Sequence, residues 1–273
     1  MMRKIIHKIF YNLLKPHKIF SKILKKIKFY SSLKKYNQNS FESIQNNYFE
    51  ELGLDRKRGT EKLKSIMNDF NLSSDMSSEH ENIFSSISLN KSFEIKNILE
   101  IGTYDGANAL LLSKVFPNSE IDTIDLDEED DEFKNFYNRK NKIEDFIKKR
   151  NFNILKGENI NFIKMNSLNL INHKKKYDLI WIDGAHGYPL VCIDIINSIN
   201  LINNNGLILC DDIYVNIDHN DSDKMYKSLA AYETLFELKK QNIVDFKLIY
   251  KRLNPEYNCL KEERKFIAIL NKQ

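Results

Sequence analysis

The sequence predicts an α/β protein with a doubly wound, mostly parallel sheet, an antiparallel strand at the C-terminal end and a helical N-terminal extension. Three features support this prediction. Short apolar runs alternate with helical stretches from about residue 96, several runs are apolar along their whole length, and the last two follow each other too closely for a helix between them. Strands that are apolar on both faces are typical of parallel sheets with helices on both sides.

The predicted elements alternate along the chain. Five strands are expected at residues 97–102, 120–126, 160–165, 177–184 and 206–212. A helix should begin after Ser78, and further helices are expected at about 106–115, 132–150, 189–202 and 224–241. Two late strands, 244–250 and 265–270, should pair antiparallel because a loop containing Pro255 separates them.

The first 36 residues differ in charge from the rest of the chain. They contain eleven Lys and Arg and no Asp or Glu, which leaves 31 basic and 38 acidic residues in the other 237. Their apolar residues recur at helical spacing with lysines on the other face. Such a helix can bind an anionic membrane surface, or its apolar stripe can dock on the body or on a second copy in a homodimer. Nucleic acid is not expected, because the body shows no basic stripe.

The chain therefore divides into three parts: a basic amphipathic extension (1–36), a polar linker with a helical lead-in (37–75) and the main domain (76–273). Three widely spaced cysteines form no CxxC pair, so neither a disulfide framework nor a zinc site is indicated. No apolar run approaches the roughly 18–20 residues of a membrane span. These features predict a cytoplasmic protein that can lie at the inner membrane surface.

The first predicted strand ends in the sequence "EIGTYDG", residues 100–106, in a chain with only 8 glycines. At the carboxyl end of a strand, Gly102 permits a tight turn and Gly106 lets the next helix begin close to a ligand. The spacing differs from the G-x-G-x-x-G of dinucleotide-binding proteins. It resembles the first motif of the class I S-adenosylmethionine-dependent methyltransferases, which have a Rossmann-like fold.

This resemblance implies a binding site for S-adenosylmethionine. In those enzymes an acidic residue at the end of the second strand binds the ribose, and Asp125 occupies that place; a carboxylate can accept two hydrogen bonds from a vicinal diol. Asn166 follows the third strand, where the family commonly has an acidic residue near the adenine. The implied donor-binding residues are Glu100, Gly102, Thr103, Gly106, Asp125 and Asn166.

Three aspartates lie at the ends of the fourth and fifth strands, where parallel sheets place their active sites. Asp183, Asp211 and Asp212 are hard oxygen ligands suited to Mg²⁺ or another divalent cation. The arrangement resembles the catechol and macrocin-type sugar O-methyltransferases, which implies a metal that binds and acidifies the acceptor hydroxyl. His186 stands where the catechol enzymes have a catalytic lysine, and histidine can accept a proton near neutral pH.

The expected function is therefore methyl transfer from S-adenosylmethionine to a hydroxyl of a small molecule or sugar, with Asp183 and His186 as catalytic residues. Two alternatives stay open. One is a metal-independent methyltransferase that uses His186 as its base, with the aspartates as a hydrogen-bonded cluster. The other is a binding module that keeps the fold without turnover. His219 lies in a polar loop that we expect to cover the acceptor.

Overall fold

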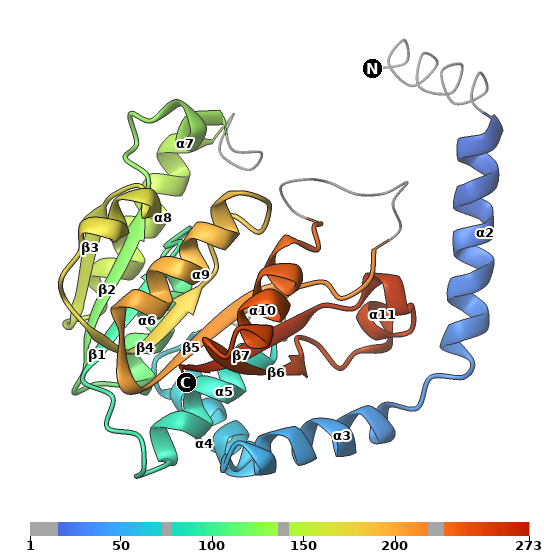
Figure 1. Ribbon diagram of the computed structural model, residues 1–273, viewed down its shortest axis with the longest axis horizontal. Helices are drawn as coiled ribbons and strands as arrows, with labels where there is room; N and C mark the ends of the chain where they lie inside the picture. Colours follow the sequence, from blue (N-terminus) through green and yellow to red (C-terminus); the bar gives the residue numbers. More distant parts are fainter. Residues whose placement is uncertain (1–15, 73–77, 136–141, 218–226, 273) are drawn as a thin grey trace.

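The computed structural model describes residues 16–72, 78–135, 142–217 and 227–272, and its centre is a seven-stranded sheet (Figure 1). The strands are β1 (Asn97–Ile101), β2 (Glu120–Asp125), β3 (Ile160–Lys164), β4 (Tyr177–Ile182), β5 (Ile202–Ile213), β6 (Val244–Tyr250) and β7 (Phe266–Lys272). Their order is β3-β2-β1-β4-β5-β7-β6. The strand β7 pairs antiparallel with β5 and β6, and the other pairs are parallel. The predicted doubly wound sheet with its antiparallel end is confirmed.

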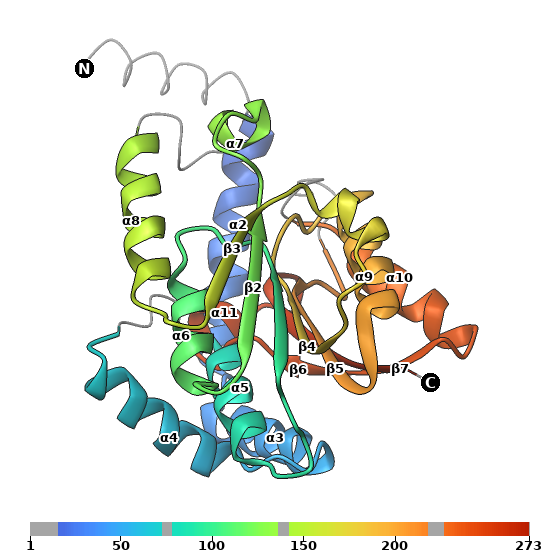
Figure 2. The ribbon, with the colours of Figure 1, turned by 90° about the vertical axis from the view of Figure 1, so that its left-hand side faces the viewer.

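Helices cover both faces of this sheet (Figure 2). On one face lie α4 (Arg56–Asp69), α5 (Glu79–Leu89), α6 (Ala107–Val115) and α8 (Ile143–Leu155), and on the other lie α9 (Leu190–Leu201) and α10 (Ala230–Lys240). The predicted helix 132–150 corresponds to two helices, α7 (Asp131–Asn135) and α8. Short helical turns complete the described chain: η1 (Ser167–Asn172), α11 (Pro255–Asn258) and η3 (Lys261–Glu263).

Two apolar clusters, one on each face, hold the helices on the sheet. Phe84 of α5 packs edge-on against Trp181 of β4 in the first cluster. Ile195 of α9 and Leu235 of α10 lie with Ile180 of β4 in the second. All five side chains are fully buried, and each contributes about 1.5–3 kcal/mol by leaving water. The central strands are therefore fixed from both sides, as their continuous apolar sequence predicts.

The segment predicted to be a polar linker contains a helix instead. Residues Gln38–Glu51 form α3, which packs beside β6. The amide of Gln45 accepts a hydrogen bond from Tyr250 N (3.0 Å) and donates one to Tyr250 O (2.9 Å). Because α3 buries one glutamine and one phenylalanine, Phe49, its sequence has no apolar stripe that would reveal a helix.

The extension forms α2 (Pro16–Leu33), which stands at the edge of the molecule beside α11 (Figure 1). Its charged side faces the body: Lys25 pairs with Glu263 (2.6 Å) and Lys28 pairs with Glu262. Five of its apolar side chains are exposed, at Phe20, Ile23, Leu24, Ile27 and Tyr30, whereas Phe29 is partly buried and lines a pocket on the side of the body. In this described part, the apolar stripe does not dock on the body. Residues 1–15 lie outside the described chain, and no helix within it is long and apolar enough to span a membrane.

Candidate active site

The loop that follows β1 lies directly against the end of β4. Gly102, Tyr104 and Gly106 all have positive φ angles, of 101°, 47° and 74°. A Cβ atom on Gly102 would lie 2.4 Å from the carbonyl oxygen of Asp183, so no other residue fits there. Gly106 begins α6 in a left-handed conformation. In the sheet, β1 has β2 on one side and β4 on the other, so the strand order reverses at β1. Open α/β sheets bind ligands at the carboxyl ends of the strands beside such a reversal.

The side chains of Glu100 and Thr103 are buried beneath the backbone of this loop. Both carboxylate oxygens of Glu100 accept hydrogen bonds, one from Asn108 Nδ2 (2.7 Å) and one from Thr123 Oγ1. Thr123 also bonds the hydroxyl of Thr103 (2.6 Å). Burial raises the pKa of Glu100 to about 7, although its two hydrogen bonds oppose the shift. These two predicted donor-binding residues therefore support the loop from below.

Asp125 lies at the end of β2, half-buried beside the same loop. Its Oδ2 atom accepts a hydrogen bond from Tyr104 N (3.0 Å), and its Oδ1 atom accepts one from Leu126 N (2.8 Å). Met165 N donates to the carbonyl oxygen of Asp125 (2.8 Å), which brings the following Asn166 close to this strand end. The exposed Asn166 also caps η1. The structure thus brings Gly102, Gly106, Asp125 and Asn166 to one edge of the sheet.

The four polar residues predicted after β4 and β5 form a cluster next to this loop. The Nε2 atom of His186 lies 3.6 Å from Asp183 Oδ1 and 3.7 Å from Asp212 Oδ2. Asp211 is buried, and Asp212, the last residue but one of β5, has a positive φ of 55°. An aspartate in the left-handed region is strained, and such strain is frequent at functional sites.

Two lysines that the sequence analysis missed complete the cluster. The Nζ atom of Lys251 bonds Asp211 Oδ2 and lies 2.5 Å from Asp212 Oδ1. Lys265 Nζ lies 2.5 Å from the other oxygen of Asp212. The side chain of Lys251 is only 2% exposed, and its backbone is fixed by a hydrogen bond from Glu79 N (2.8 Å).

The strand pairing of the structure explains the position of Lys251, which the residues around it in the sequence do not reveal. It directly follows β6, and β6 runs in the direction of β5 because both pair antiparallel with β7. Its side chain therefore emerges at the same edge as Asp211. Lys265 precedes the antiparallel β7 and reaches that edge from the opposite direction.

These aspartates do not fit a divalent cation as they stand. Mg²⁺ needs oxygen ligands that are free to coordinate it, but ammonium groups already contact one oxygen of Asp211 and both oxygens of Asp212. Among the residues that the structure describes, no group of three or more His, Cys, Asp or Glu side chains is arranged to hold a metal ion. The predicted ligands Asp183, Asp211 and Asp212 are brought together, but around lysines.

Burial within the cluster favours the neutral form of His186. Burial lowers its pKa below the ordinary value, although the carboxylates of Asp212 and Asp211 oppose this shift. Burial alone would raise the pKa of Asp212, but the positive charge of Lys251 keeps it well below its usual range. Burial and the nearby charge of Asp211 raise the pKa of Asp183 well above normal. A neutral imidazole between two acids can accept a proton.

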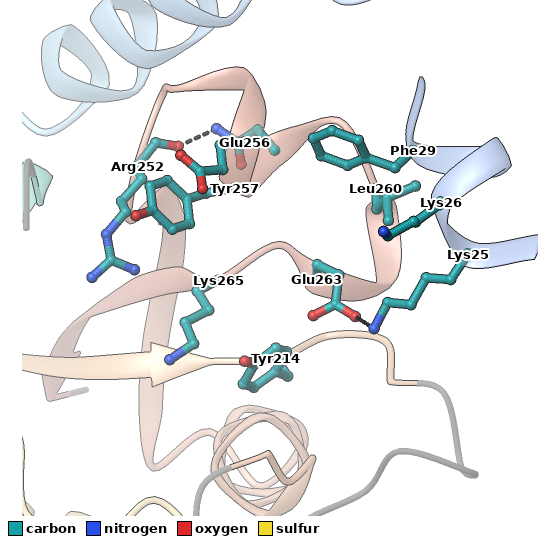
Figure 3. A pocket seen from close by; sticks show the side chains of 11 residues that line it. Lys25, Lys26, Phe29, Tyr214, Arg252, Glu256, Tyr257, Leu260, Glu263 and Lys265 are labelled. Carbon is teal, nitrogen blue, oxygen red and sulfur yellow. Dashed lines mark hydrogen bonds and ion pairs between the residues drawn. The ribbon is translucent and has the colours of Figure 1, made fainter. Parts of the chain in front are cut away.

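A pocket of about 630 Å³ adjoins this cluster (Figure 3). It lies between α2 and the segment 252–265, and Tyr214 and Lys265 line it from the sheet edge. His80 of α5 is stacked on Trp181 (5.1 Å between ring centroids), and burial lowers its pKa to about 4. His219 lies outside the described residues.

Comparison with known proteins identifies the class. A family model described as a methyltransferase domain matches residues 99–213, from β1 to the end of β5. This part of the chain is therefore similar to methyltransferase domains, the class that the sequence predicts. The match contains both the loop after β1 and the aspartates after β4 and β5, so the predicted class and fold are confirmed. The roles given to individual residues stay predictions.

Two solved structures share the fold of this methyltransferase domain. The cofactor-bound Rv0187 from MTB is 15% identical, with a TM-score of 0.50 over 78% of this chain and 89% of that chain. A putative caffeoyl-CoA O-methyltransferase from Staphylococcus aureus is 19% identical, with a TM-score of 0.50 over 78% and 91% of the two chains. No curated protein matches the sequence.

Proposed function

We propose that this chain transfers the methyl group of S-adenosylmethionine to a hydroxyl of a small molecule or sugar. The observation that supports this most directly is the contact between the loop after β1 and the residue that begins the polar cluster, Asp183. A donor bound at the loop and an acceptor bound at the cluster would then meet at one sheet edge. The S. aureus neighbour, named as an O-methyltransferase, is in keeping with this proposal.

The residues beside β1 and β2 fit the donor. Three positive φ angles shape the loop 102–106 so that its backbone turns around the start of α6. Asp125 adds a half-buried carboxylate whose oxygens accept hydrogen bonds from Tyr104 N and Leu126 N, and a carboxylate at this place is the group type that can accept hydrogen bonds from a ribose diol. S-adenosylmethionine supplies an activated methyl group, so the protein has two tasks: to align the two substrates and to deprotonate the acceptor.

His186 is the proposed base. Its neutral imidazole would take the hydroxyl proton as the acceptor oxygen bonds to the methyl carbon and the carbon–sulfur bond breaks. The proton ends on His186, the electron pair of the broken bond ends on sulfur, and the methyl group ends on the acceptor oxygen. Asp212, whose low pKa keeps it ionised and whose Oδ2 atom lies 3.7 Å from the ring, would stabilise the imidazolium that forms, and Asp183, 3.6 Å away, would help to position the ring.

This mechanism has no step that needs a divalent cation. A metal bound by Asp211 and Asp212 would first have to displace the ammonium groups of Lys251 and Lys265. Of the two enzymatic readings of the sequence, the arrangement favours the metal-independent one. The binding-module alternative is disfavoured because a neutral histidine between two carboxylates has no evident structural purpose at an open sheet edge.

Calorimetry on the full chain tests the donor site. S-adenosylhomocysteine should bind in the micromolar range, and NADH should not compete. Transfer of a labelled methyl group to a panel of sugars and phenols then separates an enzyme from a binding module. Binding of NADH in preference to S-adenosylhomocysteine would overturn the proposal.

We also propose that the extension binds an anionic membrane through its exposed apolar side. The exposed apolar residues of α2 recur with helical spacing, whereas its lysines Lys25 and Lys28 face the body. An amphipathic lysine-rich helix of this kind can lie in the membrane interface. A second copy of the chain is the alternative partner for this surface.

A further inference from the structure

The helix α8 packs against α6 and against the edge strand β3 (Figure 2). The ring of Phe146, in its first half, packs edge-on against the ring of Tyr104 in the loop after β1, with 5.1 Å between the centroids. Three further residues follow at spacings of three and four, so all four share one face of the helix. These residues are Phe146, Lys149, Arg150 and Asn153.

The same face fixes the rest of the loop after β1. Lys149 Nζ pairs with Asp105 Oδ2 (2.7 Å), and Asn153 Nδ2 donates a hydrogen bond to the carbonyl oxygen of Asp105 (2.9 Å). Gly106 lies so close to the helix backbone that a Cβ atom there would be 3.1 Å from the carbonyl oxygen of Arg150. Every residue from 104 to 106 therefore lies against α8.

The side chain of Arg150 reaches the other segment of the proposed donor site, the one after β2. It is fully buried, with its guanidinium 4.5 Å from the ring centroid of Phe162, and its Nη2 atom donates a hydrogen bond to Glu128. Glu128 lies three residues after Asp125, and its other oxygen pairs with Lys164 at the end of β3. Burial alone would raise the pKa of Glu128, but the hydrogen bonds from Lys164 and Arg150 lower it, which keeps the carboxylate ionised.

This buried ion pair is poorly suited to a purely stabilising role. Taking both charges out of water costs about as much free energy as their attraction returns. Among the described residues, the Nη1 atom of Arg150 has no hydrogen-bond partner, which adds to that cost. What the pair does provide is a fixed position for Glu128, and so for the segment that carries Asp125, relative to α8.

We propose that Arg150 is a positioning residue of the donor site, which holds the segment 125–128 in place relative to the loop 102–106. The proposal rests on the proposed function and adds to it a residue that acts through Asp125. One helix contacts both segments, so neither can move relative to the other without breaking contacts with α8. A binding group that is held in place before its ligand arrives loses less freedom on binding, which strengthens binding.

Arg150→Met in the full chain tests this role. It removes the ion pair but leaves Glu128 paired with Lys164, so no buried charge loses its only partner. Binding of S-adenosylhomocysteine should weaken about tenfold in calorimetry, because the ribose-binding carboxylate is no longer held in place. Glu129→Gln is the matched control: it removes the exposed ion pair with Lys134 and should bind as the parent does.

A double-mutant cycle with Asp125→Ala separates positioning from general destabilisation. If Arg150 acts through Asp125, the tenfold effect of Arg150→Met should fall below about twofold when Asp125 is absent. A residue that only supports the fold would weaken binding by the same factor in both backgrounds. Glu128→Gln removes the charge from the other side of the pair, should weaken binding at least about threefold, and carries the same cycle if Arg150→Met does not fold.

Parent-like binding by both variants of the pair, or an equal loss with and without Asp125, would overturn this proposal and leave the proposed function standing. A parent chain that does not bind S-adenosylhomocysteine would overturn both. Urea unfolding of the same samples shows which variants are folded at the temperature of the titrations.

Discussion

The loop after β1 and the cluster at the ends of β4 and β5 touch each other, but different kinds of contact build them. The loop depends on backbone conformation and on hydrogen bonds that its own backbone donates, such as that from Tyr104 N to Asp125, 21 residues away. The cluster depends on charges that distant segments contribute, such as Lys251 and Asp211, which are 40 residues apart. The backbone shape of the loop therefore suits ligand binding, whereas the charges of the cluster suit proton transfer.

The largest effect should come from the cluster, through the proposed base. His186→Gln should lower kcat by about 10²–10⁴-fold, the usual contribution of a positioned general base. Affinity for S-adenosylhomocysteine should stay unchanged, because the ring lies on the acceptor side. A labelled-methyl assay measures the expected loss of rate, and calorimetry on the same protein measures the expected unchanged affinity. A variant that keeps its rate would remove His186 from the mechanism.

Asp125→Ala should have the largest effect on the loop side. It removes a charged hydrogen-bond acceptor from the proposed ribose site and should weaken S-adenosylhomocysteine binding by about 1.5–3 kcal/mol. Asp127→Ala, which removes an exposed carboxylate two residues further on, is the matched control. If calorimetry finds equal affinities for the two variants, the ribose assignment is wrong.

Glu100→Gln tests whether the buried carboxyl group of Glu100, beneath the loop, favours its protonated, neutral form. Burial raises the folded-state pKa of Glu100 to about 7, above the ordinary value of 4.5, so ionisation destabilises the folded protein as pH rises between these values. The variant cannot ionise and should be more stable than the parent by roughly 2–3 kcal/mol above pH 7. The difference should vanish near pH 4. Urea unfolding at both pH values measures it, and a pH-independent difference would contradict the pKa shift.

The contrast between the two regions also explains what the sequence could predict. The strand order and the glycine turn follow from apolar runs and from two glycines whose positive φ angles few other residues accept. Asp183 and His186 were found because they follow a predicted strand closely. Lys251 was missed because its partners depend on the order of the last strands, and its sequence neighbours give no sign of a buried charge. A lysine in a chain rich in lysine is recognisable as buried only from the packing around it.

The apolar side of α2 lies outside both regions, and its proposed membrane contact should be a moderate effect. Ile27→Ser, at a side chain that is 60% exposed, should reduce sedimentation with phosphatidylserine vesicles about tenfold, since one large aliphatic side chain contributes about 1.5–3 kcal/mol when it leaves water. Ile171→Ser, at 74% exposure, is the control. If the full chain ignores vesicles but forms a dimer that Ile27→Ser disrupts in light scattering, the partner is a second copy.

The smallest expected effect is the response to chelation, and it tests the cluster most sharply. Because Lys251 and Lys265 contact Asp211 and Asp212, EDTA should change the rate of methyl transfer by less than about twofold, well below the effect of losing a bound catalytic metal. Lys251→Ala should then leave the buried carboxylate of Asp211 without its cation, a loss that typically costs about 3–5 kcal/mol. If the lysine does take a cation's place, Mn²⁺ should raise the Tm of Lys251→Ala and leave that of the parent unchanged. Lys247→Ala, an exposed lysine on β6, is the control. Loss of the parent's activity in EDTA, with recovery on adding Mg²⁺, would show that a metal displaces Lys251 during turnover.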